Sequence, residues 1–396
     1  MSENLLTTRL SGSPNLSMKY MIRPNIDSTV SSSMSTEHNR IIYMLSKMGT
    51  NYIIQSFNML TSKFTNIGTL TSADLGNPSG SLGSIVADND YIYLSRQGYG
   101  TLYRIKISDL SINTFTATNS SSAYGIMQWY DDDKNVIVIS TSYGLSLFNT
   151  ISCTWSYIKN SSNTSNKRDI AVGDRSIITT SATSTSGFIY YDKIDGTFTV
   201  QSLPSNELSN VCYNNGKYYF ARKSYLYIYD EDTKTFDETI AIPYEDKIQS
   251  LVYSDGVIFA TISGSNKLYA YSIDSHMYYY IYLPWTTVSD TSVADRITGY
   301  NKYVFIPNIT FGIINYISSS KYAVGYKMNQ YSVLYNNTYA DKFTKDPNLT
   351  LNDSSCTIVD GSEEKDMITI DAERSIKSVH VNKTDYQMIK NIQFIS

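Results

Sequence analysis

The sequence is poor in the residues that build disulfide frameworks and metal centres. It has three cysteines and three histidines among 396 residues. Cys153, Cys212 and Cys356 are far apart and form no Cys-x-x-Cys pair, which argues against a disulfide framework or a structural zinc site. No histidine has a second His or Cys at ligand spacing. We therefore expect no metal and no cofactor, and cysteines that are buried thiols in a reduced compartment.

Long apolar runs and an excess of positive charge are also missing. No stretch approaches the roughly 18 apolar residues of a membrane span, and no basic segment followed by an apolar run precedes the rest of the chain. The net charge is −4, and no stripe of Lys or Arg interrupts the sequence. Because contacts to a phosphate backbone need such a stripe, we expect no nucleic-acid partner and no membrane span.

Tyrosine is the abundant residue. The chain has 36 tyrosines against 8 prolines, with 41% hydrophobic and 13% aromatic residues. This is enough apolar surface for a large core, so the chain is not of the disordered class. Aromatic and β-branched residues favour pleated, half-buried strands. The composition therefore predicts an all-β fold.

A repeat of strand-like runs extends along most of the chain. The runs have spacings of 50, 45, 40, 41, 40 and 46 residues. They open at or near these positions: Ile42, Ile92, Ile137, Ile177, Tyr218, Ile258 and Val304. The blades of β-propellers repeat at about 40 to 50 residues. The spacing predicts a seven-bladed β-propeller of four-stranded antiparallel blades over residues 37–337.

Each unit repeats the same order of strands and turns. Asn215-Gly216 and Asp255-Gly256 stand where a tight turn joins the first and second strands, since two-residue hairpins need positive φ. The third strand ends in an aromatic residue, and a second aromatic follows seven residues later. The pairs are Phe57 and Phe64, Phe148 and Trp155, Tyr191 and Phe198, Tyr229 and Phe236, and Tyr271 and Tyr278. Two units deviate by one residue, with Ile107 and Phe115, and Tyr316 and Tyr322.

The stretch Tyr229 to Phe236 resembles the turn between the third and fourth strands of Kelch-type blades. The steps Leu203-Pro204, Ile242-Pro243 and Leu283-Pro284, which close three fourth strands, resemble that family too. The Gly-Gly doublet of a Kelch second strand is absent throughout, and so are WD dipeptides. The Kelch-like resemblance therefore implies the propeller architecture and not membership of the Kelch family.

The two flanks break the repeat. Residues 1–36 are polar and contain one strand candidate, Met18 to Ile22, that could close the last blade. Residues 338–396 have alternating runs that predict a small β-rich attachment element. Unpaired strands are templates for pairing with another chain. We therefore expect the flanks to bind other proteins of a larger, oligomeric assembly.

The motifs that would support catalysis are missing. Tyr130-Asp131-Asp132-Asp133-Lys134 is interpreted as a turn of the third blade rather than a calcium loop, because Ca²⁺ needs six to eight oxygens. A sialidase-type Asp-box fails in the stretch before Trp155, where Thr150 and Ser152 replace its Asp and Gly. No GxSxG, Walker or GxGxxG pattern is present. We expect a protein that is not an enzyme.

The longer loops are predicted on one face of the propeller. These are the connections between the second and third strands and between blades, and they include residues 72–83, 118–124, 158–168 and 285–297. Loops on a rigid scaffold commonly bind ligands. Tyr99, Tyr124, Tyr143 and Trp285 lie in these loops and are the candidate ligand-binding residues, with Trp285 and Tyr143 as the main anchors. A surface glycan or an envelope protein is the expected ligand.

In overall style the chain resembles structural or receptor-binding proteins of bacteriophage tails, baseplates or related particles. It is rich in Ser, Asn, Thr and Tyr, poor in Cys, and has short polar flanks. The resemblance implies a virion protein made in the host cytoplasm without a signal peptide. Two alternatives stay open: an intracellular Kelch-like protein-interaction scaffold, and a carbohydrate-active propeller enzyme, which needs an acid and base pair.

Overall fold

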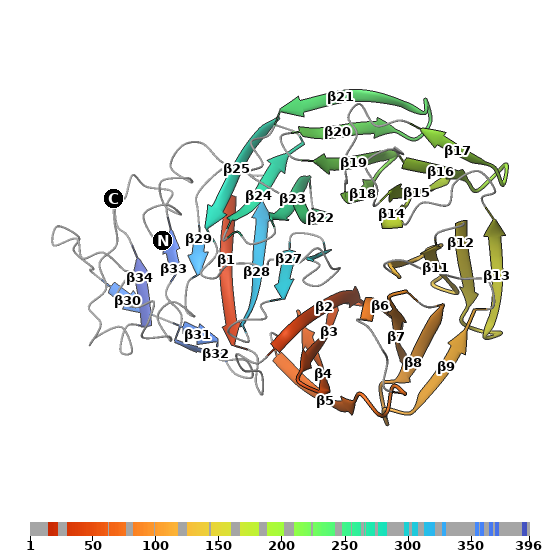
Figure 1. Ribbon diagram of the computed structural model, residues 1–396. Coiled ribbons are helices and arrows are strands. Elements are labelled where there is room, and N and C mark those ends of the chain that lie inside the picture. The colour runs from red at the N-terminus through yellow and green to blue at the C-terminus, as the bar shows by residue number, and fades with distance from the viewer. Residues whose placement is uncertain are drawn as a thin grey trace.

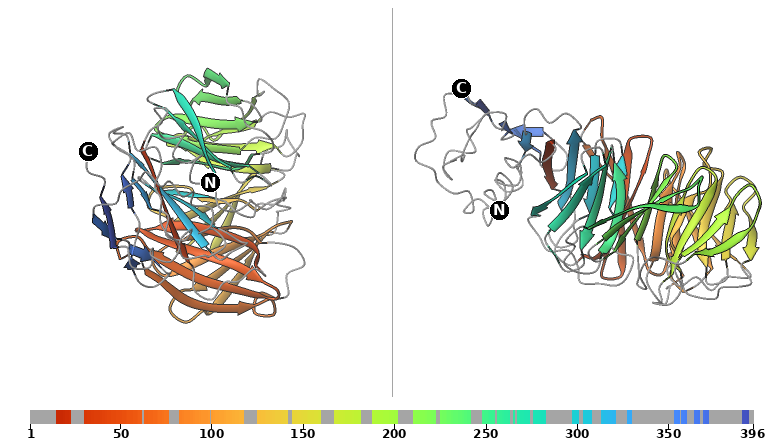
Figure 2. Two further views of the ribbon diagram at one scale, coloured as in Figure 1. Left: turned by 90° about the vertical axis from the view of Figure 1, so that its left-hand side faces the viewer. Right: turned by 90° about the horizontal axis from the view of Figure 1, so that it is seen from above.

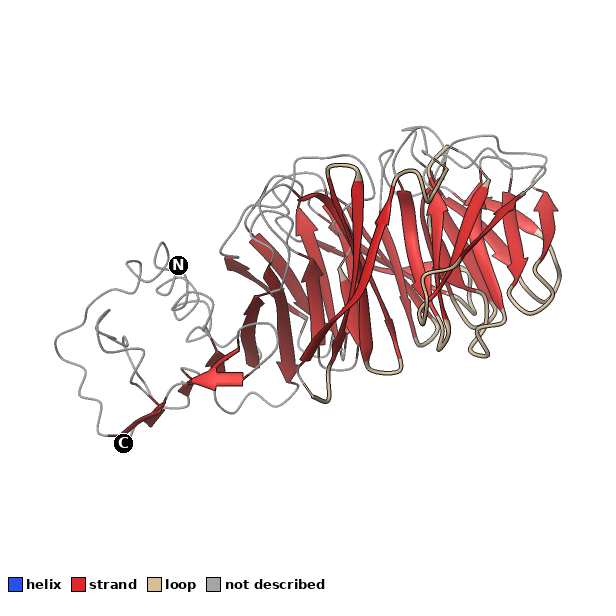
Figure 3. Ribbon diagram, turned by 90° about the horizontal axis from the view of Figure 1, so that it is seen from below, coloured by secondary structure: helices blue, strands red, loops and turns tan. Residues whose placement is uncertain are grey.

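The computed structural model describes most strands and many turns of the chain. The described residues are 15–22, 30–61, 63–76, 82–98, 100–117, 125–141, 144–159, 167–181, 188–201, 210–222, 225–241, 248–254, 256–262, 265, 267–273, 276–282, 297–300, 303–307, 313–320, 327–329, 353–355, 357–359, 364–366, 369–371 and 390–393. All regular elements within these ranges are strands, and none is a helix (Figure 3). The prediction of an all-β fold is confirmed.

Six blades, each made of four consecutive antiparallel strands, follow one another around a central axis (Figure 1). Blades 1 to 3 contain β2 (Val30–His38), β3 (Ile41–Met48), β4 (Asn51–Asn58) and β5 (Lys63–Thr71); β6 (Leu82–Ala87), β7 (Tyr91–Arg96), β8 (Thr101–Lys106) and β9 (Ile112–Thr116); and β10 (Met127–Trp129), β11 (Val136–Thr141), β12 (Gly144–Asn149) and β13 (Thr154–Lys159). Blades 4 to 6 contain β14 (Lys167–Val172), β15 (Ser176–Ser181), β16 (Phe188–Asp192) and β17 (Phe198–Gln201); β18 (Asn210–Asn214), β19 (Lys217–Arg222), β20 (Tyr225–Asp230) and β21 (Thr235–Ala241); and β22 (Ile248–Ser254), β23 (Val257–Ile262), β24 (Lys267–Ser272) and β25 (Met277–Tyr282). The predicted β-propeller of four-stranded antiparallel blades is confirmed.

A composite sheet completes the ring between blade 6 and blade 1. Its first three strands are β26 (Thr298–Tyr300), β27 (Tyr303–Pro307) and β28 (Ile313–Ser320), and its fourth is the N-terminal β1 (Asn15–Ile22), which pairs antiparallel with β28. β26 contacts β22 on one side and β2 on the other. The chain therefore has six blades of consecutive strands and not seven, because the fourth strand of the last sheet comes from the opposite end of the repeat region.

The repeat in the sequence follows one structural position. The seven anchor residues lie on the second strands β3, β7, β11, β15, β19, β23 and β27, and each is 0% exposed. A second strand is covered by neighbouring strands on both edges and by blades or sheets on both faces, so its middle tolerates only apolar or fully hydrogen-bonded side chains. The period is visible in the sequence because burial is complete at this position.

Pairs of aromatic residues extend the buried row outward from the anchors. In blade 3, Ile137 pairs with Phe148, which pairs with Trp155, and the two rings are 5.0 Å apart. The same cross-strand pairing joins Phe57 to Phe64, Tyr191 to Phe198, Tyr229 to Phe236 and Tyr271 to Tyr278. Such pairs add stability beyond the area they bury. The predicted spacing of seven residues follows from the short turn between the third and fourth strands, which places the two aromatic residues opposite each other.

The two deviating units were assigned incorrectly. In blade 2 the row continues from Ile92 to Ile105 and Ile112, which are also seven residues apart, rather than through Ile107. In the composite sheet, Val304 pairs with Ile317, and Ile317 pairs with Met18. The predicted partner of Tyr316, Tyr322, lies outside the described residues. In blade 2 the predicted Ile107 lies two residues after Ile105, in the turn that follows β8.

Both hairpin turns of each blade lie at the same end of the ring, here called the hairpin face. In blade 4 the backbone N–H of Lys193, in the turn after β16, donates to the carbonyl of Arg175, in the turn after β14 (2.8 Å). The same link recurs between these bonded pairs: Met59 and Arg40, Ile107 and Asp90, Thr150 and Asn135, Glu231 and Gly216, and Ile273 and Gly256. The opposite end, with the other connections, is called the loop face.

The flanks differ in how far they enter the ring. Two strands of the ring come from the predicted N-terminal flank. β1 lies wholly within it, and β2 lies within it up to residue 36, so residues 15–22 and 30–36 are structural parts of the propeller. β1 includes the predicted closing strand, Met18 to Ile22. Short strands follow the composite sheet and lie outside the ring beside it (Figures 1 and 2). They pair as β29 (Lys327–Asn329) with β33 (Thr369–Asp371), β30 (Asp353–Ser355) with β34 (Lys390–Gln393), and β31 (Thr357–Val359) with β32 (Glu364–Asp366).

Candidate functional site at the axis of the hairpin face

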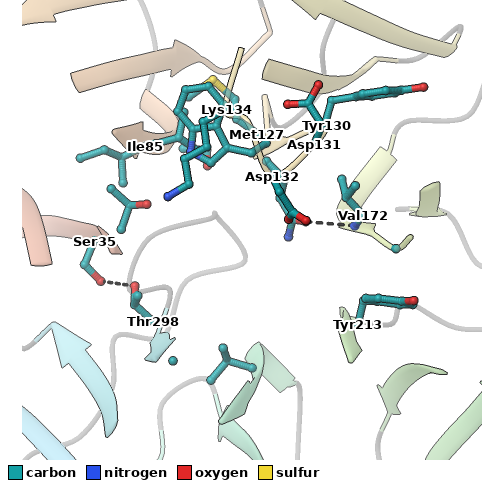
Figure 4. Close-up of a pocket in the computed structure, with 18 of the residues that line it drawn as sticks. Ser35, Ile85, Met127, Tyr130, Asp131, Asp132, Lys134, Val172, Tyr213 and Thr298 are labelled. Atoms are coloured by element: carbon teal, nitrogen blue, oxygen red, sulfur yellow. Dashed lines mark hydrogen bonds between the residues drawn. The ribbon is translucent and has the colours of Figure 1, made fainter. Parts of the chain in front are cut away.

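A pocket of about 840 Å³ lies on the propeller axis toward the hairpin face (Figure 4). The innermost strands of blades 1 to 6 and of the composite sheet all contribute to its wall, and the turns of blades 3 and 4 contribute to its mouth. Apolar side chains such as Ile85, Met127 and Val172 line the wall, while charged side chains gather near the mouth. The volume is in the range of small-ligand sites, which combine an apolar wall with a few polar groups.

The turn between β10 and β11 supplies the acidic part of the mouth. It is the Tyr130 to Lys134 run that the sequence predicts to be the first hairpin turn of the third blade, and the structure places it there. Asp131 and Asp132 line the pocket and are exposed to solvent. Asp174, in the equivalent turn of blade 4, lines it as well and is also exposed. Three carboxylates from two neighbouring blades therefore meet at one opening.

Lys193 is a half-buried cation of the pocket. Its ammonium donates to the carbonyl oxygens of Gly173 (2.7 Å) and Tyr130 (3.0 Å), and it lies 4.8 Å from the centre of the Tyr130 ring. Burial lowers the pKa of Lys193, and the nearby carboxylates, Glu231 foremost, act in the opposite direction. The side chain thus bridges blade 4 to blade 3 through neutral acceptors.

Lys134 reaches from the mouth to blade 1. Its ammonium donates to Nδ1 of the buried His38 (2.8 Å), while His38 Nε2 lies 2.9 Å from Oδ1 of Asn89 in blade 2. An ammonium has no acceptor, so Nδ1 of His38 accepts this hydrogen bond. One imidazole in this way connects three blades.

Glu231 joins blades 4 and 5 behind the pocket wall. Glu231 is 3% exposed, and its carboxylate accepts hydrogen bonds from Ser176 Oγ (2.6 Å), Tyr213 Oη (2.8 Å) and the backbone N–H of Arg175 (3.0 Å). Tyr213 lines the pocket, and burial raises its pKa well above the ordinary value. A charge this deeply buried is stable because several donors converge on it.

Gly173 permits the close approach of these groups. A Cβ atom at this position would lie 2.6 Å from Oε1 of Glu231 and 2.7 Å from the Tyr213 ring. Any side chain would therefore push the Glu231 network away from the pocket wall. The first turn of blade 4 needs a glycine for space and not for backbone conformation.

The arrangement is suited to binding. It brings together free carboxylates, apolar walls and aromatic rings on strands whose positions the ring fixes. Within the described ranges, no three His, Cys, Asp or Glu side chains are placed as ligands of one metal ion. Among the same residues there is also no helix that could cross a membrane.

The four residues that the sequence predicts to bind a ligand, Tyr99, Tyr124, Tyr143 and Trp285, lie outside the described residues. The pocket residues Lys193, Asp174 and Tyr213 were not predicted. The available signal was positional, since Asp174 occupies the same turn as the acidic run one blade earlier.

Comparisons with known proteins bear on the fold alone. No family model matches the chain, and no curated protein matches it. Among solved structures, the chain is similar to Chaetomium thermophilum Raptor with a TM-score of 0.58 and 10% identity, over 80% of this chain and 30% of that one. It is similar to the computationally designed Ika8 protein (TM-score 0.52, 9% identity, 78% and 100% covered) and to a chain of the Mitotic Checkpoint Complex (TM-score 0.55, 9% identity, 77% and 94% covered).

These similarities support a β-propeller and no closer relationship. The chain spans less than a third of the Raptor chain that it matches. The fold by itself defines no function, because one fold hosts many unrelated functions.

Proposed function

We propose that the protein is a rigid, non-catalytic interaction scaffold. The observation that supports this most directly is the set of polar bridges between blades on the hairpin face. Glu231 connects blade 5 to blade 4, Lys193 connects blade 4 to blade 3, and Lys134 connects blade 3 to blade 1. A surface whose parts are already fixed loses little conformational entropy when it binds a partner.

More specifically, we propose that the protein is a structural or receptor-binding component of a bacteriophage tail, baseplate or related particle. The composition supports this form, and the virion is then its location. The C-terminal flank is the better candidate for attachment to other particle proteins, because strands of the N-terminal flank are used within the ring. The receptor-binding version uses the loop face, with Trp285 and Tyr143 as anchors.

The test is co-expression of the full chain with the products of the genes next to its own, followed by native mass spectrometry. We expect a stable complex of defined stoichiometry with at least one product encoded beside tail or baseplate genes. The same preparation is incubated with envelope glycans, and no release of new reducing ends is expected. A chain that stays free of every neighbour contradicts the scaffold proposal, and glycan cleavage contradicts its non-catalytic part.

A further inference from the structure

Exposed aliphatic side chains recur at one position of the hairpin face. Leu60, Ile151 and Ile194 are 70%, 75% and 66% exposed. Each stands two residues after the Asn or Asp that ends the third strand of its blade. Ile151 and Ile194 belong to the adjacent blades 3 and 4, the two blades whose turns form the acidic mouth of the pocket. Single exposed aliphatic residues are ordinary, but side chains of this size repeated on the face that holds a pocket mouth are typical of binding surfaces.

The carboxylates of the mouth act on the Lys193 ammonium only at a distance and are in direct contact with no cation of the described residues. In the described part of the chain, Asp131, Asp132 and Asp174 have no ion pair and accept no side-chain hydrogen bond, although two lysines line the same pocket. The ammonium of Lys193 is taken up by two backbone carbonyls, and that of Lys134 by His38. The mouth thus has three negative charges that its own cations do not bind directly.

We propose that the hairpin face over blades 3 and 4 is a docking surface for a protein segment with an Arg or Lys side chain, which enters the axial pocket between Asp131, Asp132 and Asp174. Aliphatic neighbours in that segment pack on Ile151 and Ile194. This inference deepens the proposed scaffold function, and it rests on that function.

Charge complementarity favours a basic peptide over the other occupants. Tyr130, whose ring lies 4.8 Å from the ammonium of Lys193, lines the same pocket as the carboxylates. A guanidinium or ammonium can use both features. A divalent cation fits less well, because the three carboxylates line one pocket but are not placed as ligands of one metal ion. A small organic cation would leave Ile151 and Ile194 outside the pocket without a function.

The probe is an immobilised array of random octapeptides, incubated with the labelled full-length chain at low and at physiological salt. We expect the bound peptides to be enriched in Arg or Lys with an aliphatic residue nearby, and the binding to weaken as salt rises. The variant Asp131→Asn/Asp132→Asn/Asp174→Asn removes three exposed charges and should bind the selected peptides about tenfold more weakly. Ile194→Ser should weaken the binding of these peptides to a lesser extent.

Asp232→Asn is the matched control. Asp232 is an exposed carboxylate in a turn of blade 5 on the same face, but it pairs with Arg175 (2.9 Å) and does not line the pocket. It should leave peptide binding unchanged. The melting temperature of every variant is measured. If that of the triple variant is lowered, the single variant Asp174→Lys replaces it. Asp174 is exposed and accepts no side-chain hydrogen bond within the described ranges, so this change should not disturb the fold.

Several results would overturn the inference. They are selection of acidic or uncharged peptides, no selection at all, equal binding by the triple variant, and loss of binding in Asp232→Asn. Binding of a parallel glycan array without any preference for basic peptides would also overturn it, in favour of a sugar ligand. If the chain forms its complex with a neighbouring gene product while the triple variant binds peptides normally, the pocket inference fails and the scaffold proposal stands.

Discussion

The six blades and the composite sheet have the same four-stranded shape but are assembled differently. In blade 3, β12 and β13 are joined by a short turn in which Asn149 Oδ1 accepts hydrogen bonds from the backbone N–H groups of Ile151 and Ser152. In the composite sheet, the third and fourth strands come from distant parts of the chain, and Asn15 pairs with Ser320. The blades therefore form from local contacts, and the ring closes through a contact between the two ends of the repeat region.

Substitutions in a blade and changes to the composite sheet should therefore have different effects. A substitution within a blade removes part of the packing of that blade. Loss of β1 instead exposes an edge of β28 and leaves the ring without its last strand. Three changes, from the largest expected effect to the smallest, test this contrast.

Removal of residues 1–22 should have the largest effect. The deletion takes away all eight cross-strand pairs between β1 and β28, so we expect loss of most of the roughly 5 to 15 kcal/mol that stabilises an ordinary domain. Urea unfolding and melting curves measure it. A chain that lacks only residues 1–14 keeps β1 and is the control. A synthetic peptide of residues 15–22 should restore part of the loss by strand addition, and equal stability of both deletions would show that β1 does not close the ring.

Phe148→Ala should destabilise blade 3 by about 3 to 5 kcal/mol. Phe148 is 0% exposed, and its ring lies 4.8 Å from that of Phe115 in blade 2 and 5.0 Å from that of Trp155. Its removal leaves a cavity between two blades. Urea unfolding gives the free energy, and Ile151→Ala at an exposed turn of the same blade should stay within about 0.5 kcal/mol of the parent. A similar loss in both variants would disprove the importance of the buried row.

Asp230→Asn should have the smallest effect, and that effect should depend on pH. The backbone N–H of Thr233 and further donors stabilise the ionised Asp230 and lower its pKa, with a smaller contribution from the Lys217 ammonium. A lowered pKa in the folded state adds stability above the unfolded value near 4, and this stability is lost as the pH falls through the folded pKa. Asn keeps the acceptor oxygen but does not titrate, as Asn149 shows in blade 3.

Urea unfolding at pH values from about 2 to 6 measures how the free energy of unfolding of each protein depends on pH. The free energy of unfolding should fall less steeply with acid for Asp230→Asn than for the parent, and the two should agree within about 1 kcal/mol at neutral pH. Asn149→Asp is the reciprocal variant, and it should make the fall steeper. Parallel curves for all three proteins would show that the turn carboxylate does not contribute to acid sensitivity.

The fold was predictable from the sequence where burial repeats, and the site was not. Positions such as Ile137 and Tyr218 are fully buried in every unit, so they remain apolar or aromatic and reveal the period. The strand partner of β28 was harder to assign, because pairing across the whole repeat leaves no local pattern, and the sequence offered Met18 to Ile22 only as a candidate. The pocket requires knowing that turns of blades 3 and 4 converge at the axis. Nothing local in Lys193 indicates that its ammonium meets the carbonyl of Tyr130.

The closing strand also has a consequence for synthesis on the ribosome. Asn15 and its partner Ser320 are separated by 305 residues (320 − 15), so β1 emerges long before β28 exists. At the roughly 5 to 20 residues per second of translation, this interval is about 15 to 60 s. During that time the six blades can form in order while the nascent β1 still lacks its partner. The ring can therefore close only late in synthesis, after β28 has been made, and the pairing edge of β1 stays without its partner until then.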